Sequence, residues 1–395
     1  MPGRHFLFIP GPTNVPDRVL RAMHRSMEDH RSSDFPALTR GLLRDLAPVF
    51  GTTAGRPFIF PGTGTGGWEI ALTNTLSPGD RVLAVRNGQF SLLFTQAAIN
   101  LGLDVTTIDV DWGEPAPPDA IEAALRQDAD RAIRAVLVVH NETATGVTSD
   151  IAAVRRALDA ADHPALLFVD GVSSIGSIPF SMDAWGVDAA IAGSQKGLML
   201  PAGLAVVAMS QRALAAADQA RLPRSVFDLR PMAAQNDAGY FPYTPPLSLM
   251  YGLREALTMF AEEGHAAVHA RHARLASGVR AAVAAWGLSL CSRQAAAHSD
   301  TVSAIVVPPD IDARTVIDLA FRRYDLSLGS GLGPLAGRVF RIGHMGDLNE
   351  LMLLGALAGV ELALADAGLD VPFGAGVAAA QQQWRQAPVL VEQPA

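Results

Sequence analysis

Lys196 is the only lysine among the 395 residues of this chain, whereas arginine occurs 30 times. An arginine guanidinium stays protonated at ordinary pH, but a neutral lysine amine can form an imine with a carbonyl group. A bias toward arginine could leave one lysine by chance, so the neighbours of Lys196 have to be considered. They form the segment GSQKGLML, in which Gly193 and Gly197 let a ligand approach the backbone closely. The segment therefore indicates a lysine that reacts with a carbonyl compound, either a substrate or pyridoxal phosphate.

Asp170 ends the apolar run ALLFVD, 26 residues before Lys196. A carboxylate in this place could keep the pyridine nitrogen of pyridoxal phosphate protonated, which makes the ring an electron sink. A turn-forming aspartate before glycine is the plainer alternative. Because ligands of open α/β sheets bind at the carboxyl ends of strands, the position favours the cofactor role.

The segment PGTGTGGWEIAL places glycines and threonine hydroxyls between a predicted strand and a helix. Such helix starts bind phosphate through backbone N–H groups, so Thr63, Gly64 and Thr65 are the candidates. The same glycines also match the dinucleotide pattern of oxidoreductases, which expects an acidic residue at the end of the next strand. Here the run RVLAV is followed by Arg86 and Asn87, and neither is acidic. We therefore favour the phosphate of pyridoxal phosphate and keep a nicotinamide-dependent oxidoreductase as the alternative.

An amino-acid substrate needs a cation for its carboxylate, and arginine offers a two-pronged donor. Arg341 in RVFRIGH is the candidate, although spacing alone fits a solvated arginine better. The segment HNETATG, which follows the run AVLVV, is rich in hydroxyl and amide groups that could contact a cofactor. Its first residue, His140, could equally be a core histidine.

Short apolar runs alternate with helical patterns from about Pro57 to Ala208, which predicts an α/β domain with a mainly parallel sheet. The polar segments described above follow the carboxyl ends of these runs. The predicted strands are Pro57–Phe60, Arg81–Val85, Ala135–Val139, Ala165–Val169, Asp188–Ala192 and Leu204–Ala208.

A helix-favouring stretch covers residues 246–285, and shorter strand and helix patterns follow it. We expect an N-terminal arm (1–20), a large domain (21–245), a linking helix (246–285) and a small α+β domain with a tail (286–395). In the small domain the predicted strands are Thr301–Val307 and Arg338–Ile342, and the predicted helices are Ala313–Arg322 and Asp347–Ala365. The tail begins at about Gly368.

The composition is that of a globular protein, with 49% hydrophobic and 18% charged residues. A formal net charge of -8 and the lack of clustered arginines argue against nucleic acid or an anionic membrane as partner. The single cysteine, Cys291, allows no intramolecular disulfide and no cysteine-rich metal site. There is no signal-peptide pattern and no apolar run of about 18 residues, so we expect a cytoplasmic protein. We also expect no bound metal.

These segments, in this order, resemble the class V aminotransferases of fold type I, and among them the serine-glyoxylate aminotransferases. The resemblance runs nearly from end to end and includes FIPGPTNVP, FPGTGTGGWE, HNETATGV, GSQKGLMLPAGL, YFPYTPPL and GRVFRIGHMGDLNEL. It implies a fold type I transferase that depends on pyridoxal phosphate and that works as a homodimer with shared active sites or as a higher oligomer.

The resemblance also implies a role for each site residue. Lys196 binds the cofactor covalently and moves a proton, and Asp170 pairs with the pyridine nitrogen. The phosphate contacts are Thr63, Gly64, Thr65, Gln195 and, from the neighbouring subunit, Thr244. Phe90 and Val172 cover the two faces of the ring, and Thr143 contacts its hydroxyl group. Arg341 and the backbone of Gly11 hold the substrate carboxylate.

The implied reaction is transamination from L-serine to glyoxylate, which gives hydroxypyruvate and glycine. L-Alanine or L-aspartate could replace serine as the donor, and the roles of Arg31 and of the aromatic residues from Tyr240 to Tyr243 stay open. Cysteine desulfurases share this architecture but need a mobile catalytic cysteine. Cys291 lies in the apolar run AWGLSLCSR, which predicts a buried structural thiol instead. A non-catalytic binding protein is a further alternative, against which the presence of Lys196, Asp170 and Arg341 argues.

Overall fold

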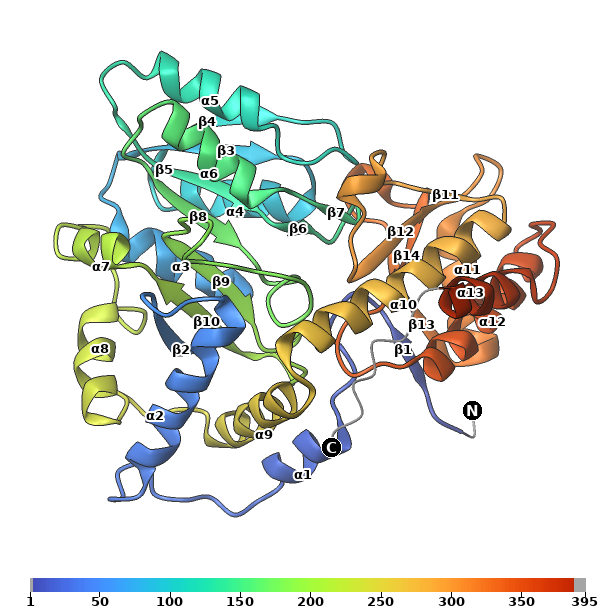
Figure 1. The fold of residues 1–395 in the computed structure, drawn as a ribbon, viewed down its shortest axis with the longest axis horizontal. Coiled ribbons are helices and arrows are strands. Elements are labelled where there is room, and N and C mark those ends of the chain that lie inside the picture. Colours follow the sequence, from blue (N-terminus) through green and yellow to red (C-terminus); the bar gives the residue numbers. More distant parts are fainter. Residues whose placement is uncertain (1–2, 387–395) are drawn as a thin grey trace.

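The computed structural model describes residues 3–386 (Figure 1). Residues 1–2 and 387–395, the latter being the end of the predicted tail, lie outside the described part. None of the described helices is both long enough and apolar enough to cross a membrane.

A seven-stranded sheet forms the centre of the larger part of the molecule (Figure 1). Its strand order is β2-β10-β9-β8-β5-β3-β4, and β10 runs antiparallel to both of its neighbours while the other pairs are parallel. All six predicted runs are strands of this sheet, which confirms the mainly parallel α/β architecture. The bounds are β2 (Arg56–Gly62), β3 (Arg81–Arg86), β4 (Asp104–Asp109), β5 (Ile133–Val139), β8 (Leu166–Asp170), β9 (Ala189–Gly193) and β10 (Gly203–Met209).

The sequence reading missed β4, which lies at one edge of this sheet and pairs with β3. Its sequence, DVTTID, contains no fully buried residue. An edge strand with polar side chains lacks the continuous apolar run by which the buried strands were recognised.

Helices connect the parallel strands, as such connections require. Nine of the twelve residues of α3 are buried, so this helix lies deep against β9 and β10. Large apolar side chains such as Phe58, Phe60 and Phe168 fill the core around the sheet. The helices of this part are α1 (Asp17–Met23), α2 (Phe35–Leu46), α3 (Gly64–Thr75), α4 (Gln89–Asn100), α5 (Pro118–Gln127), α6 (Ile151–Ala160), α7 (Gln211–Ala217) and α8 (Leu229–Ala238).

A second sheet, of order β1-β13-β14-β12-β11, has its own hydrophobic core (Figure 1). Its first strand, β1, comes from the predicted N-terminal arm and pairs in parallel with β13. Residues 6–8 therefore join the sheet that carries Arg341. The bounds are β1 (Phe6–Phe8), β11 (Ser289–Leu290), β12 (Val302–Val306), β13 (Leu326–Ser330) and β14 (Val339–Gly343), with helices α11 (Ala313–Tyr324), α12 (Glu350–Asp366) and α13 (Ala375–Gln386).

Two helices, not one, occupy the predicted linking stretch: α9 (Leu247–Glu263) and α10 (His265–Ala285). Gly264 separates them with a φ of 83°, a left-handed conformation that glycine adopts without strain. The expectation of a single linking helix was therefore wrong, because one glycine in a helix-favouring stretch ends the first helix. α10 runs from α9 to the second sheet (Figure 1). The domain division inferred from the sequence stays a prediction.

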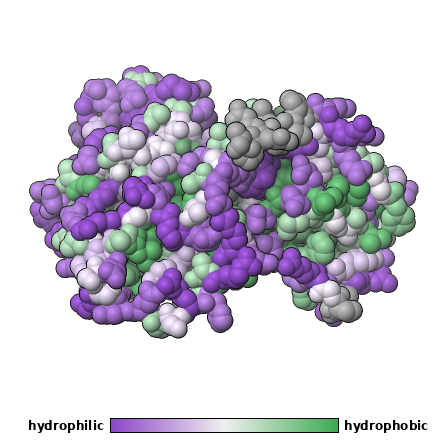
Figure 2. All heavy atoms as spheres, turned by 60° about the horizontal axis from the view of Figure 1, so that its bottom comes forward, coloured by the Kyte–Doolittle hydropathy of each residue, from purple (hydrophilic) through white to green (hydrophobic). Residues whose placement is uncertain are grey.

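Hydrophilic residues cover much of the face seen in Figure 2, and hydrophobic residues gather in patches on both of its halves. Several large apolar side chains are exposed in the described chain, among them Met27 (69%) and Val226 (51%).

Candidate active site

Loops at one edge of the large sheet bring most of the predicted site residues together. Asp170 is the last residue of β8, and Lys196 follows the end of β9 by three residues. Because β2, β5, β8 and β9 run in the same direction, their carboxyl ends open on the same crevice. A cavity of about 80 Å³ lies there, lined by Gly64, Thr65, Trp68, Phe90, Asn141, Thr143, Asp170, Val172, Ser173, Gln195 and Lys196.

Three larger hollows, of about 770, 490 and 470 Å³, lie elsewhere on the molecule. None of the predicted site residues lines them. The small cavity is therefore the candidate site, because it is where the reactive amine and the buried carboxylate meet.

Lys196 is buried, and its amine donates a hydrogen bond to the carbonyl oxygen of Pro10. Burial, with the nearby positive charge of Arg341, lowers its pKa to about 8, and the negative charge of Asp170 opposes this shift. Thr13 holds the backbone of the lysine loop, since its hydroxyl donates to the Lys196 carbonyl oxygen over 3.1 Å. The neutral amine that attack on a carbonyl requires is thus populated near neutral pH.

Asp170 has two hydrogen-bond donors and almost no contact with solvent. Trp68 Nε1 donates to one carboxylate oxygen over 3.0 Å, and the backbone N–H of Val172 donates to the other over 2.8 Å. Burial nevertheless raises its pKa to about 6, against the effect of these donors and of Lys196. A buried carboxylate of this kind favours a cationic partner in the cavity.

The first turn of α3 forms one wall of the cavity. Gly64 and Thr65 line it, whereas Thr63, the residue before the helix, is exposed and does not. A Cβ atom on Gly64 would lie 2.4 Å from Val172 Cγ2, so glycine is required for this close packing. Gln195 lies across from the turn, and its buried Oε1 has no hydrogen-bond partner among the described residues. Backbone N–H groups at a helix start and a nearby amide can bind an anion.

Arg341 lies on β14, in the second sheet, and does not line the cavity, but it contacts Thr143, which does. Its Nη1 donates to the carbonyl oxygen of Thr143 over 3.0 Å, and its Nε donates to that of Ser330 over 2.8 Å. Burial lowers its pKa to about 10, and the charge of Glu142 opposes the shift. The guanidinium is therefore a buried cation beside the site.

Gly11 lies against the side chain of Lys196, where a Cβ atom would come within 2.5 Å of Lys196 Nζ. Its φ of 108° is also left-handed. The N-terminal PGPTN loop is thus in contact with the lysine, as the predicted position of Gly11 near the substrate requires.

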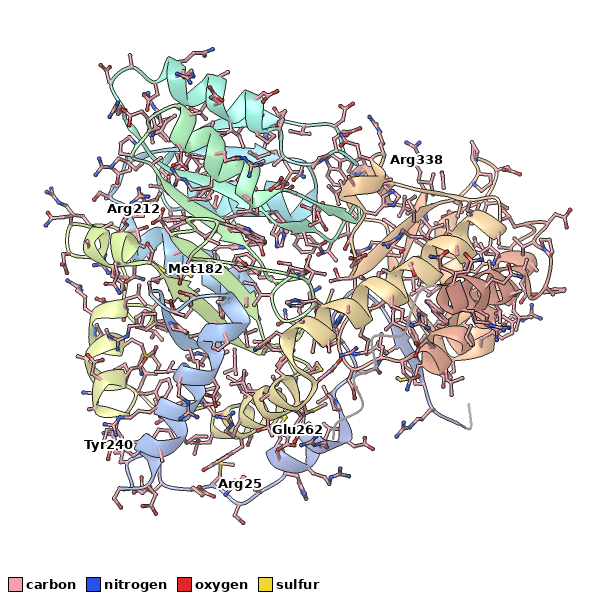
Figure 3. All side chains as sticks on the ribbon, viewed as in Figure 1. Arg25, Met182, Arg212, Tyr240, Glu262 and Arg338 are labelled. Atoms are coloured by element: carbon pink, nitrogen blue, oxygen red, sulfur yellow. The ribbon has the colours of Figure 1, made fainter. Side chains whose placement is uncertain are left out.

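Thr244 is exposed and lies outside the cavity of its own chain. The neighbouring aromatic residues pack elsewhere, since Tyr240 lies 6.4 Å from the ring of Phe35 and its hydroxyl donates to the carbonyl oxygen of Ser32. Figure 3 shows Tyr240 at the periphery of the molecule. Arg31, which precedes Ser32 in the chain, is exposed. One chain alone does not bring these residues to its cavity.

Three cavity residues were missed by the sequence reading: Trp68, Asn141 and Ser173. Ser173 accepts hydrogen bonds from the Thr143 hydroxyl over 3.0 Å and from Asn141 Nδ2 over 2.9 Å. Trp68 and Asn141 lie inside segments that the sequence analysis described, and Ser173 follows Asp170 by three residues. The segments were therefore recognisable from the sequence, but the individual residues were not.

Cys291 is half-buried directly after β11, and burial raises the pKa of its thiol. It does not line the cavity, and it is less buried than the predicted structural thiol because the adjoining strand is short and lies at the sheet edge. His140 is buried between the rings of Phe180 and Trp185, and burial lowers its pKa to about 4. Among residues 3–386 no group of three or more histidine, cysteine, aspartate or glutamate side chains could hold a metal ion.

Comparisons with known proteins identify the family of this chain. The family model for class-V aminotransferases matches residues 5–319. The serine–glyoxylate aminotransferase of Methylorubrum extorquens is 59% identical over 98% of each chain, and the L-aspartate–glyoxylate aminotransferase of Paracoccus denitrificans is 52% identical over 100% of each. The structure of ureidoglycine–glyoxylate aminotransferase from Bacillus subtilis has a TM-score of 0.90 at 28% identity and covers 98% of this chain and 99% of that one. This chain therefore belongs to the class-V aminotransferases, enzymes that depend on pyridoxal phosphate.

Proposed function

We propose that this chain transfers the amino group of L-serine to glyoxylate and releases hydroxypyruvate and glycine. The observation that carries the proposal is the 59% identity, over 98% of both chains, with an enzyme named for this reaction. L-Aspartate is the second candidate donor, because a relative named for aspartate is 52% identical over its whole length. L-Alanine is the third donor that the family resemblance allows.

The residues around the cavity fit pyridoxal phosphate. The first turn of α3 and the amide of Gln195, whose Oε1 lacks a partner among the described residues, suit its phosphate. Asp170, whose pKa burial raises, suits the protonated ring nitrogen. The bound cofactor supplies an electron sink for the electrons left at the substrate Cα.

Phe90 and Val172 would cover the two faces of the cofactor ring, and Thr143 would contact its hydroxyl group. All three line the cavity, and Val172 packs directly against Gly64. Thr63, Gly64 and Thr65 hold the phosphate, with the exposed Thr63 contributing at the start of the helix.

Lys196 would hold the cofactor covalently, and its free amine would carry the proton to and from the substrate Cα. Its pKa of about 8 supports this role, because a base close to the operating pH transfers protons efficiently in both directions. The carbonyl of Pro10 accepts a hydrogen bond from the free amine.

Arg341 holds the carboxylate of serine and, in the second half of the reaction, that of glyoxylate. Two of its nitrogens donate to the carbonyls of Ser330 and Thr143, and these bonds fix the plane of the guanidinium. The backbone at Gly11 lies beside Lys196 and contributes to the same carboxylate site.

The active unit in this proposal is a homodimer with shared sites, and dimers could associate further. Thr244 is exposed on its own chain, which leaves it available to the phosphate site of a partner subunit. Residues 21–245 bind the cofactor and 286–395 form the small domain, with 1–20 as the arm and 246–285 as the link. We place the enzyme in the cytoplasm, with amino acids and 2-oxo acids as its partners.

The absorbance spectrum of the holoenzyme tests the donor. L-Serine, L-alanine and L-aspartate are added separately without an oxo acid, and glyoxylate is added afterwards. We expect serine to bleach the cofactor band fastest and glyoxylate to restore it. If another donor bleaches the band faster, that donor replaces serine in the proposal. An enzyme without a cofactor band contradicts the proposal as a whole.

Because the chain has a single lysine, the attachment point can be tested separately. Borohydride reduction of the holoenzyme should fix the cofactor on the peptide that contains Lys196, as mass spectrometry would detect. The variant Lys196→Arg is the control, since a guanidinium cannot form this bond.

A further inference from the structure

Glu142 is a fully buried carboxylate that the proposed reaction does not use. It ends the short strand β6 (Asn141–Glu142), directly before Thr143, and is 0% exposed. Burial raises its pKa to about 7, although three backbone N–H groups oppose the shift. A buried acidic group with this many dedicated donors calls for an explanation.

The Glu142 carboxylate joins two separate segments. Its Oε2 accepts from the backbone N–H groups of Phe90 and Ser91, both over 3.0 Å, in the first turn of α4. Its Oε1 accepts from the N–H of Ala144 over 3.0 Å, on the far side of Thr143. At Gly88 a Cβ atom would come within 2.3 Å of Glu142 Cγ, so the approach is close enough to require glycine.

The groups held in this way border the cavity. Phe90 lines it from α4, and Thr143 lines it from the turn that Glu142 closes. The carbonyl of Thr143 in turn accepts from Arg341 Nη1 over 3.0 Å, and Arg341 also feels the negative charge of Glu142. The Glu142 side chain thus contacts the segments that carry Phe90 and Thr143 and, through Thr143, supports Arg341.

We propose that Glu142 is a positioning residue that sets Phe90, Thr143 and, through Thr143, Arg341 for substrate binding. The inference rests on the proposed role of Arg341 in holding the substrate carboxylate. Both oxygens of the side chain must accept for the two segments to be joined. Glutamine has one acceptor and one donor at these positions, so its NH₂ group would face either the N–H groups of α4 or that of Ala144.

The chain offers a matched control in Glu361 on α12. It is 3% exposed, and its carboxylate accepts from the backbone N–H groups of Gly374 and Gly376 and from Trp286 Nε1, over 2.7, 2.6 and 3.0 Å. Trp286 belongs to the core of the second sheet, Gly376 is buried and Gly374 is exposed, and none of the three lines the cavity. The substitution Glu361→Gln therefore also places an amide among the donors of a buried carboxylate, but it makes no contact with the site.

The experiment compares the two variants with the wild type as holoenzymes. Calorimetry measures the affinity for 3-hydroxypropionate, which has the carboxylate and hydroxyl of serine but no amine to react. We expect Glu142→Gln to weaken binding by about tenfold or more and to raise KM for serine more than it lowers kcat, because a misplaced positioning group loses its ligand contacts. It should also change the circular dichroism of the cofactor band, since Phe90 faces the ring in the proposed function. Glu361→Gln should leave all three unchanged.

Equal affinities in the wild type and Glu142→Gln overturn the inference, and so does an equal loss of affinity in both variants. If Glu142→Gln does not fold, Glu142→Asp replaces it, because a carboxylate one methylene shorter cannot reach both segments; wild-type affinity in this variant also overturns the inference. A wild-type enzyme that neither binds 3-hydroxypropionate nor reacts with serine contradicts the proposed function itself.

Discussion

Asp170 and Lys196 have pKa values displaced in opposite directions by one cause. Burial disfavours the charged form of each group, so the carboxyl pKa rises to about 6 and the amine pKa falls to about 8. Their mutual attraction opposes both shifts without cancelling them. In the proposed function the protonated ring nitrogen of the cofactor would be a positively charged partner for the Asp170 carboxylate.

The raised pKa of Asp170 makes the stability of the apoenzyme depend on pH. A carboxyl whose pKa is higher in the folded protein than its ordinary value of 3.8 binds its proton more tightly when folded. Its contribution is therefore fully present below pH 4 and is lost as the pH rises through about 6. The variant Asp170→Asn does not titrate at this position. We expect the free energy of unfolding of the wild type, minus that of the variant, to fall by up to about 3 kcal/mol from pH 4 to 7.

Denaturant unfolding of both apoenzymes at a series of pH values measures this difference. Taking the difference removes the opposite contribution of buried histidines such as His272, whose pKa burial lowers. A difference that stays constant over this range would show that Asp170 is not held in a desolvated state.

At the scale of elements, α3 is a rigid support for the site. Its residues pack against the sheet so closely that a Cβ atom on Gly67 would lie 2.5 Å from Ile191 Cγ2, and one on Gly64 would lie 2.4 Å from Val172 Cγ2. Gly66, on the other side of the turn, would place its Cβ 3.5 Å from Phe227 Cζ, an ordinary contact. An added Cβ atom would therefore clash at Gly64 and Gly67 but not at Gly66.

We expect Gly64→Ala to weaken the binding of pyridoxal phosphate by about tenfold or more, or about 1.4 kcal/mol, because Val172 or the helix start must shift. Gly66→Ala is the control and should leave cofactor affinity unchanged, with a gain of up to about 1 kcal/mol in stability from the better helix former. Titration of the two apoenzymes with cofactor, followed by tryptophan fluorescence, distinguishes the variants. Equal cofactor affinities of the two variants would show that the close packing at Gly64 does not affect cofactor binding.

At the scale of the whole molecule, the site residues come from both sheets and from the N-terminus. β1 joins β13 beside the strand of Arg341, and the loop that follows β1 reaches Lys196. By contrast Thr244 lies on the surface of its own chain. The proposed dimer would bring it to the phosphate site of a partner.

Mixed dimers test whether sites are shared. We expect Lys196→Ala and Thr244→Glu each to be inactive alone, the second because a carboxylate repels the phosphate. When the two are co-expressed, half of the dimers are mixed, and each mixed dimer contains one intact site. Recovery of about a quarter of wild-type activity is therefore expected. Activity that does not recover would show that Thr244 serves its own chain, and a Thr244→Glu variant that is active alone would show that Thr244 serves no site.

The sequence alone indicated the main elements and the chemistry because both are encoded locally. The six buried strands of the large sheet are continuous apolar runs, and the residues that follow them are contiguous polar segments. Lys196 was conspicuous by composition, and Asp170 by its place at a strand end. The edge strand β4 and the break at Gly264 escaped because polar edges and single glycines give weak signals.

The tertiary structure alone decided which of these segments meet. The Trp68 indole on Asp170, the Pro10 carbonyl on Lys196 and the Glu142 carboxylate on Phe90 join residues 102, 186 and 52 positions apart. Periodicity and motif spacing describe neighbours along the chain and carry no information on such pairs. These contacts, and the pKa shifts that follow from them, arise only when packing excludes water from groups brought together by the fold.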